Sequence, residues 1–221
     1  MSPPIVDGEA ASRPLTVAKV LRARIVAGQY TEGERLVEDR LAKEFGVSRI
    51  PIREAFRILA AEGFLRLVPY RGAFIDSVDR QSAENVLEIR RALEPVAAYR
   101  AALNRDDDDI ELLERLYADG MRAMERGNFE QLPSLNSKLH GVMWSASGNR
   151  ELQTLLEQLG YKIAWVYSLT ARRRAKSSWQ EHLELLTAIK DGDQSLAKKL
   201  MVDHIDAAAE AQRLRPNQSR G

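Results

Sequence analysis

The chain has 221 residues, of which 44% are hydrophobic and 29% are charged, and its formal net charge is +1. This length accommodates one large domain or two small ones, and a net charge near zero does not by itself indicate a nucleic-acid partner. The sequence has no apolar run of the roughly 18 residues that cross a bilayer and no signal peptide. Cysteine is absent, so we expect a cytoplasmic protein without a membrane partner, disulfides or thiolate metal sites.

The N-terminal part of the sequence begins with helical patterns. Residues 1–12 are polar and aperiodic, and we expect them to be a disordered tail. From Leu15 the apolar residues recur at helical spacing until Gly28, which ends the first predicted helix. A second short helix is predicted over 37–45, with Gly46 after it as a tight turn.

A third helix and a hairpin complete this region. The helix is predicted from Ser48 to about Gly63. Residues 64–68 and 73–75 are short β-prone runs joined by a turn sequence, which predicts a two-stranded hairpin. Three helices followed by a hairpin are typical of a winged helix-turn-helix, which we assign to residues 13–79.

The rest of the chain has almost no strand signal. Short polar breaks separate about six helical patterns, which predicts an antiparallel helical bundle over residues 84–213 and a frayed tail over 214–221. The helices are predicted near residues 81–103, 107–126, 128–147, 149–171, 176–191 and 193–213. The fold class is therefore mainly α, with an N-terminal winged helix-turn-helix followed by this bundle.

Two arginines mark the start of the third predicted helix as a candidate DNA-reading element. Arg49 and Arg53 are four residues apart and share one helix face, directly after the capping residue Ser48. Arginine is suited to bidentate hydrogen bonding with guanine in the major groove. Spacing alone leaves a second interpretation open, in which these arginines pair with Glu54, Glu62 or no partner.

Two further basic positions extend this candidate face. Arg57 lies one turn beyond Arg53 and is placed to meet a phosphate. The turn of the hairpin contains Arg71 and Gly72, where glycine permits close backbone approach to the adjacent minor groove.

The same region contains four stretches in a fixed order: Gly33-Glu34-Arg35-Leu36, Leu41 to Phe56, Ala61-Glu62-Gly63-Phe64 and Pro69 to Phe74. Together they resemble the GntR family of bacterial regulators over about residues 13–79. The resemblance implies DNA binding through Ser48, Arg49, Ile50, Pro51, Arg53, Arg71 and Gly72. The sequence departs from some relatives at Asp39, where they carry an arginine, and the adjacent Arg40 points elsewhere on the helix.

The chain has three histidines, and they fall on three different predicted helices. His140, His182 and His204 each lie on an apolar stripe, so all three are expected to face the bundle interior, and Asn136 lies one turn before His140. Imidazoles that converge in a bundle favour a first-row divalent metal such as Zn, Ni or Mn. Spacing does not prove convergence, and a single inward histidine is more often an ordinary core residue.

The C-terminal region also contains ordered stretches: Glu88 to Glu94, Asn136 to His140 with Gly148-Asn149 after it, His182 ahead of Ala188-Ile189, and Asp203-His204. They resemble the FCD domain, the ligand-sensing domain of FadR-like GntR regulators, over about residues 84–210. The resemblance implies a divalent metal held by Asn136, His140, His182 and His204 beside an effector pocket. Many relatives have aspartate in place of Asn136, so we expect weaker metal affinity here.

Arg90 is the candidate clamp for an effector carboxylate, and the alternative is an ordinary ion pair with Glu94 one turn away. We therefore expect a homodimeric repressor or activator that binds a palindromic operator and responds to a small organic acid. A pure metal sensor and a metal-dependent enzyme are the alternatives. No H-E-x-x-H motif is present and Glu181 is expected on another face than His182, so we predict that the protein is not an enzyme.

Overall fold

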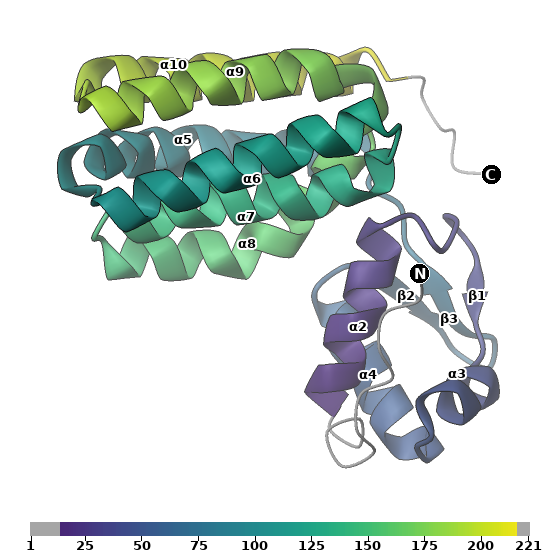
Figure 1. Cartoon of the computed structure of the whole chain (residues 1–221). Helices are drawn as coiled ribbons and strands as arrows, with labels where there is room; N and C mark the ends of the chain where they lie inside the picture. Colours follow the sequence, from purple (N-terminus) through teal and green to yellow (C-terminus); the bar gives the residue numbers. More distant parts are fainter. Residues whose placement is uncertain (1–13, 216–221) are drawn as a thin grey trace. The chain divides into compact units, whose positions relative to one another are not determined.

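The computed structural model describes residues 14–215, which form two compact units, Met1–Ser77 and Val78–Gly221. Both units are shown in Figure 1. The predicted N-terminal tail lies outside the described residues, as does the predicted C-terminal tail apart from Leu214 and Arg215.

The N-terminal unit combines three helices with a small sheet. Its elements are α2 (Pro14–Val26), β1 (Arg35–Leu36), α3 (Glu38–Phe45), α4 (Arg49–Ala61), β2 (Leu65–Val68) and β3 (Gly72–Ile75). The sheet is antiparallel, with strand order β1-β3-β2 and Leu36 opposite Ala73. The predicted two-stranded hairpin is present as β2 and β3. The third strand β1 was not predicted, because a two-residue strand is too short to produce an alternating pattern.

Apolar packing fixes the angle at which α4 leaves α3. Gly46 ends α3 in the left-handed region with φ 67°, a conformation that costs glycine little. Leu21 of α2 and Ile52 and Leu59 of α4 are completely buried in the core of this unit. The buried residues of α4 all lie on one side, so the opposite side of the helix faces solvent.

The C-terminal unit consists of helices with short connections. They are α5 (Arg80–Asn104), α6 (Asp107–Glu125), α7 (Leu132–Ala146), α8 (Arg150–Ser168), α9 (Ala171–Asp191) and α10 (Gln194–Arg213), with a 3-10 turn η1 (Phe129–Gln131) before α7. Side chains that accept backbone N–H groups begin several of them: Asp79, Asp106, Asn149 and Asp193. The predicted mainly helical fold class is confirmed.

The boundary between α8 and α9 differs from the expectation. We placed the break at residues 172–175, a basic run, but α9 begins at Ala171 and continues through it. Ala171, Arg174 and Ala175 are buried on one face of α9, so the run is an amphipathic helical turn. The break at Leu169 and Thr170 contains no glycine, proline or acidic residue, so no local signal marked it.

α5 is central to the bundle, packing along α10 and also against α7, α8 and α9. Figure 1 shows α9 and α10 side by side, with α7 and α8 as the other adjacent pair. This arrangement brings α5, α7, α9 and α10 around one interior region. Within residues 14–215, none of the helices combines the length and the apolarity that a membrane span requires.

A glycine allows the closest contact between α6 and α9. A Cβ added to Gly120 of α6 would lie 1.9 Å from ring carbons of Trp179 of α9, whose side chain is completely buried. The Trp179 indole nitrogen donates a hydrogen bond to the backbone oxygen of Tyr117, 3.0 Å away. The ring therefore has a fixed position that requires glycine opposite it.

We expect Gly120→Ala to lower the free energy of unfolding of the C-terminal unit by about 1–3 kcal/mol, because the added methyl overlaps the indole. Gly141→Ala is the matched control in α7, where an added Cβ meets no atom within 4 Å. Because alanine is favoured over glycine in a helix by about 1 kcal/mol, the control should be neutral or stabilising. Urea unfolding followed by tryptophan fluorescence measures both, and equal stability of the two variants would refute the packing argument.

Candidate nucleic-acid interface and metal centre

The start of α4 presents most of the predicted DNA contacts to solvent. Ser48, Arg49 and Arg53 are exposed, and Ile50 is 71% exposed. Ser48 is the N-cap residue of α4 as expected, but its side chain makes no capping hydrogen bond, which leaves the hydroxyl to other partners. Pro51 is buried, so its side chain does not share this surface and instead anchors the first turn of the helix.

Each arginine on the exposed side of α4 is paired with an acid. Arg49 Nε lies 2.5 Å from Asp39 Oδ1, and Arg53 Nε lies 2.7 Å from Glu38 Oε2. The third pair, Arg57 with Glu54, has a separation of 2.5 Å. The alternative interpretation of the sequence was that arginines of this helix pair with Glu54 or Glu62. The structure has the pair of Glu54 with Arg57, whereas Glu62 pairs with Arg22 of α2.

These pairs do not prevent DNA binding. The three arginine side chains are 59%, 54% and 68% exposed in the order Arg49, Arg53 and Arg57. Exposed ion pairs contribute about 0–1 kcal/mol, because water and salt screen them. Phosphates or base edges can therefore replace the acids at small cost, and the pairs hold the arginines extended until then.

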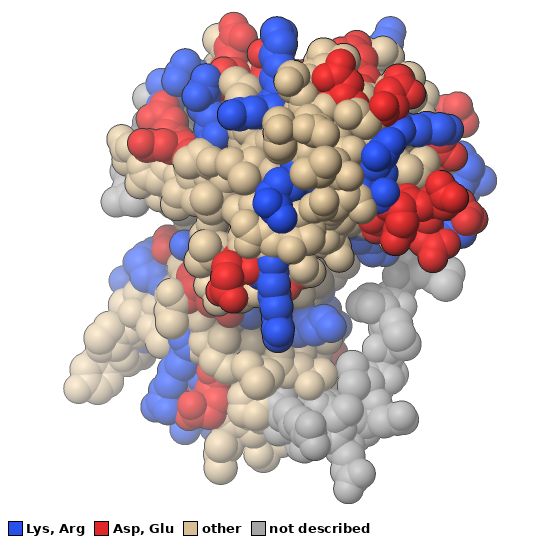
Figure 2. Space-filling view, turned by 90° about the vertical axis from the view of Figure 1, so that its left-hand side faces the viewer, with Lys and Arg blue, Asp and Glu red and all other residues tan. Residues whose placement is uncertain are grey.

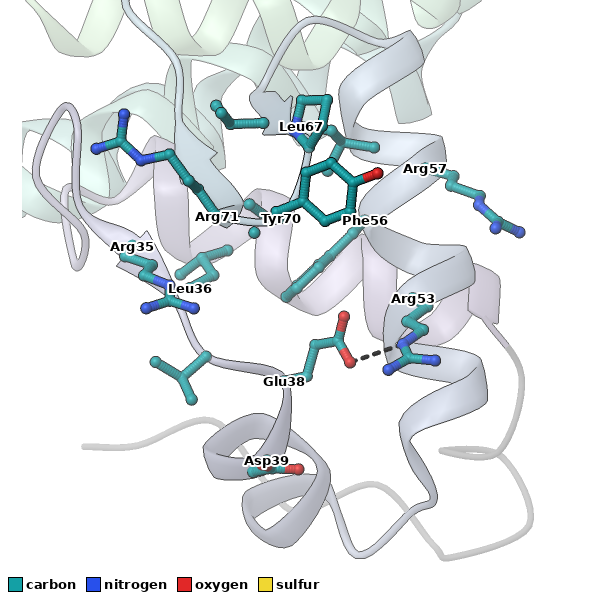
Figure 3. A pocket seen from close by; sticks show the side chains of 15 residues that line it. Arg35, Leu36, Glu38, Asp39, Arg53, Phe56, Arg57, Leu67, Tyr70 and Arg71 are labelled. Carbon is teal, nitrogen blue, oxygen red and sulfur yellow. Dashed lines mark hydrogen bonds and ion pairs between the residues drawn. The ribbon is translucent and has the colours of Figure 1, made fainter.

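A groove of about 640 Å³ separates α4 from the hairpin turn and reaches back to β1 and the start of α3. Figure 3 shows basic side chains around it that come from separate elements: Arg35, Arg53, Arg57 and Arg71. Arg35 was not among the predicted contacts, because the short strand β1 that brings it to the groove gives no signal in the sequence. The groove has the basic lining that a phosphate backbone requires.

The hairpin turn exposes an aromatic ring at its tip. Tyr70 has a φ of 62°, in the left-handed region that residues other than glycine and asparagine rarely adopt. Its side chain is fully exposed. The Arg71 N–H donates to the Val68 oxygen at 3.0 Å and closes the turn. Arg71 also lies over the Phe74 ring, with 6.0 Å from its guanidinium carbon to the ring centre. The turn thus exposes the side chains of Tyr70 and Arg71 to solvent.

The charge signal for DNA is local. On the face shown in Figure 2, basic and acidic side chains are interspersed. The formal net charge of +1 agrees with this mixture. The candidate interface is therefore defined by which arginines the fold gathers at α4 and the hairpin turn, and not by an overall basic surface.

The three histidines converge at the centre of the C-terminal unit. His140 of α7, His182 of α9 and His204 of α10 are buried, and one ring nitrogen from each lies within 4.8 Å of the others. The Nε2 atoms of His140 and His182 are 3.3 Å apart. The inward orientation expected from the apolar stripes is what the structure has.

A carboxylate contacts the outer nitrogen of two of these rings. His140 Nδ1 lies 2.8 Å from Glu94 Oε2 of α5, and His204 Nδ1 lies 2.7 Å from Glu181 Oε2 of α9. The expectation that Glu181 points to another face was wrong. Its side chain extends from α9 to the ring of His204 on the neighbouring helix α10. Each carboxylate accepts the Nδ1 hydrogen and so directs the Nε2 lone pair into the cluster.

Burial favours the neutral form of His182 and His204. Burial, together with the nearby His204 and His140, lowers the pKa of His182 well below its ordinary value. Burial and the proximity of His140 have the same effect on the pKa of His204. Burial alone would raise the pKa of Glu94, but the Arg90 guanidinium beside it holds that pKa well below its usual range. Ionised carboxylates and neutral imidazoles are the states that metal binding needs.

Asn136 is the fourth predicted ligand and is 1% exposed. Within residues 14–215, its amide oxygen and nitrogen make no hydrogen bond, and the Nδ1 atom of His182 makes none. Buried polar atoms without a partner cost about 1–3 kcal/mol each, so such atoms commonly indicate a bound ion, water or ligand. Three imidazoles with a nearby unpaired amide form a donor set that fits a first-row divalent cation.

Arg90, the candidate effector clamp, is buried and paired with Glu94. Its guanidinium donates two hydrogen bonds to Glu94, at 2.6 and 3.2 Å, and is 2% exposed. The alternative interpretation, an ion pair one helical turn apart, is the arrangement that the structure has. Sequence analysis missed the equivalent pair on α9, where Arg174 lies 2.5 Å from Glu181.

Known proteins match both units of the chain. The family described as "Bacterial regulatory proteins, gntR family" matches residues 15–75, and the FCD domain matches residues 85–207. The HTH-type transcriptional regulator YdhC of Bacillus subtilis is 31% identical over 189 residues, which cover 84% of each chain. The HTH-type transcriptional repressor RspR of Escherichia coli is 25% identical over 199 residues, 89% of this chain and 87% of RspR.

Solved structures agree on the fold. E. coli McbR/YncC superposes with a TM-score of 0.79 at 22% identity, covering 90% of this chain and 96% of its own. A GntR transcriptional regulator from Rhodococcus sp. RHA1 gives a TM-score of 0.80 at 20% identity, covering 92% and 99%. The resemblance to GntR and FCD sequences is confirmed, and the chain belongs to the GntR family of bacterial regulators as a DNA-binding transcriptional regulator with an FCD domain.

Proposed function

We propose that this regulator binds a divalent metal, Zn, Ni or Mn, through His140, His182 and His204 with Asn136, and that a small carboxylate bound beside the metal changes its affinity for operator DNA. The observation that carries the proposal is the convergence of three buried imidazoles, two of them oriented by carboxylates. A histidine that serves only the core needs partners for its one donor and one acceptor, and does not require two further imidazoles beside it.

The surroundings of the cluster favour an anionic effector. Glu94 is balanced by Arg90, and Glu181 is balanced by Arg174. With an amide at Asn136, the ligand set itself is neutral, so a bound dication keeps its full charge and supplies the attraction for a carboxylate. Arg90 and Arg174 are the two buried guanidiniums beside the cluster, and a carboxylate that reaches either would compete with its glutamate.

The link to DNA follows from two-state binding. A homodimer would present two α4 helices to a palindromic operator, with half-site spacing set by the dimer. An effector that binds one arrangement of the C-terminal units more tightly shifts the population toward it and changes operator affinity. The direction, repression or activation, depends on which arrangement fits the operator.

A pure metal sensor is the competing proposal, and loss of operator binding on metal addition alone would favour it. The enzyme alternative gains little from the structure. Glu94 and Glu181 do lie beside the histidines, but each is already engaged by an arginine and a ring nitrogen. The relatives named above are transcriptional regulators, in agreement with a protein that is not an enzyme.

Metal binding is tested by native mass spectrometry of the purified protein and calorimetric titration of the metal-stripped protein with Zn²⁺. We expect one ion per chain, and loss of at least ten-fold in affinity for His182→Gln, which removes one of three imidazoles. Asn136→Asp should bind more tightly than wild type, because a carboxylate oxygen is the stronger ligand. Asn85→Asp, which adds the same charge at an exposed position of α5, is the control. Equal or weaker binding by Asn136→Asp would remove Asn136 from the ligand set.

DNA binding and metal binding should separate by mutation. Arg49→Ala is expected to abolish binding to duplexes that the wild-type protein selects from a randomised library, because it removes the central candidate base contact. The control is Arg40→Ala, a change of the same type at an exposed position of α3. Zn²⁺ titration of both variants should match wild type. Loss of metal binding together with DNA binding would contradict the assignment of the two sites to separate units.

The metal-stripped protein should lose stability in acid. The folded-state pKa values of His182 and His204 lie below their unfolded value of about 6.5. Below that pH the unfolded chain binds more protons than the folded chain, so the free energy of unfolding falls by up to about 1.4 kcal/mol per pH unit for each histidine. All three tryptophans, Trp144, Trp165 and Trp179, lie in the C-terminal unit and report its unfolding alone.

Urea titrations at pH 7.5, 6.5 and 5.5 measure this slope. His182→Gln removes one titrating group and should flatten the decline. A free energy of unfolding that stays constant or rises as the pH falls through this window would show that the rings are already protonated in the folded state.

A further inference from the structure

Two acids at the start of α3 face the start of α4. Asp39 contacts Arg49 and is 61% exposed, whereas Glu38 contacts Arg53 and is 32% exposed. Both acids line the groove between α4 and the hairpin turn, and Figure 3 shows Glu38 between α3 and Arg53. They therefore lie on the surface assigned to DNA, where a negative charge is repelled by phosphate.

The Arg49–Asp39 contact leaves the reading end of the arginine available. It uses Arg49 Nε and Asp39 Oδ1, with 2.5 Å between them. The two terminal nitrogens of the guanidinium are the ones that pair with guanine O6 and N7. Asp39 thus contacts Arg49 at the nitrogen nearest the side-chain stem, and no contact to its terminal nitrogens is needed to hold the pair.

Asp39 itself can only accept hydrogen bonds. In the major groove the base edges offer two donors, the N4 amino group of cytosine and the N6 amino group of adenine, and carboxylates pair characteristically with cytosine N4. A thymine or guanine at the same place presents an oxygen acceptor, which an ionised carboxylate repels. A carboxylate on this face therefore discriminates between bases both by attraction and by repulsion.

We propose that Asp39 determines part of the operator sequence: while Arg49 contacts a guanine, Asp39 accepts a hydrogen bond from the N4 amino group of a cytosine in the neighbouring base pair. The inference rests on the proposed role of the start of α4 in base contact. Asp39 is suited to this role and Glu38 is not, because Glu38 is less exposed and its partner Arg53 lies a full turn further along α4.

The test is selection of duplexes from a randomised library by the full-length protein, comparing wild type with Asp39→Asn. The variant keeps the size of the side chain and removes its charge. We expect the cytosine preference at one position of each half-site to fall about ten-fold, as expected for one lost base contact, while the guanine preference that depends on Arg49 is retained. Asp39→Glu, which keeps the acceptor, should retain part of the cytosine preference.

Glu44→Gln is the matched control. Glu44 is also on α3 and is ion-paired with an arginine, Arg24, at 2.5 Å, so the substitution removes the same charge from the same helix. Both variants should bind non-specific duplex somewhat more tightly, because one negative charge is gone. Only Asp39→Asn should change the base preference.

Two results would overturn the inference. If the preferences of Asp39→Asn equal those of Glu44→Gln at every position, Asp39 acts through charge alone. If Asp39→Asn loses the guanine preference and keeps the cytosine preference, Asp39 only positions Arg49. If Arg49→Ala binds the selected duplexes as tightly as wild type, the role of the start of α4 is refuted, and with it this inference.

Discussion

Two carboxylates, each held between an arginine and a histidine, organise the centre of the C-terminal unit. Glu94 joins Arg90 to His140, and Glu181 joins Arg174 to His204. Breaking a buried ion pair by removing one partner costs about 3–5 kcal/mol, so the three residues of each arginine–glutamate–histidine set depend on one another. The carboxylates fix the tautomer of two rings, and the rings in turn define the space that a cation would occupy. Glu94 thereby connects α5 to α7, and Glu181 connects α9 to α10.

The DNA face also contains arginine–carboxylate pairs, but there the pairs contribute little to the free energy of folding. Arg49 and Arg53 are paired with acids as Arg90 is, but their pairs are more than half exposed on the arginine side. In water such a contact contributes less than about 1 kcal/mol, so a base or a phosphate can replace it. Exposure alone therefore separates the pairs that hold the fold from those that can be exchanged for a ligand.

The histidine cluster and the candidate DNA contacts lie in different units of the chain. The C-terminal unit contains every histidine and tryptophan of the chain, whereas the N-terminal unit contains the exposed arginines of α4 and the hairpin turn. Under the proposed function, a ligand bound at the histidines would influence DNA binding by its differential affinity for two arrangements of a homodimer. The buried polar atoms of Asn136, which have no partner within residues 14–215, give such a ligand a source of binding energy.

Sequence periodicity determined which faces of the helices are buried, because burial requires apolar side chains to recur with the helical period. It placed His140, His182 and His204 inside the bundle, and the glycine and aspartate signals located most helix ends. The pattern failed where local chemistry is weak: the two-residue strand β1 and the boundary at Thr170 carry no distinctive residues. Resemblance to known sequences, and not net charge, indicated the DNA-binding function.

Only the tertiary structure decided which side chains meet. Glu94 and Glu181 contact histidines on other helices, 46 and 23 residues away in the chain. Arg35 and Asp39 join the DNA face because β1 pairs with β3 and α3 packs against α4. Helical spacing predicts the direction of a side chain from its own axis, but the partner depends on the angle and register between two helices. That geometry is set by the packing of the whole core, which no single segment encodes.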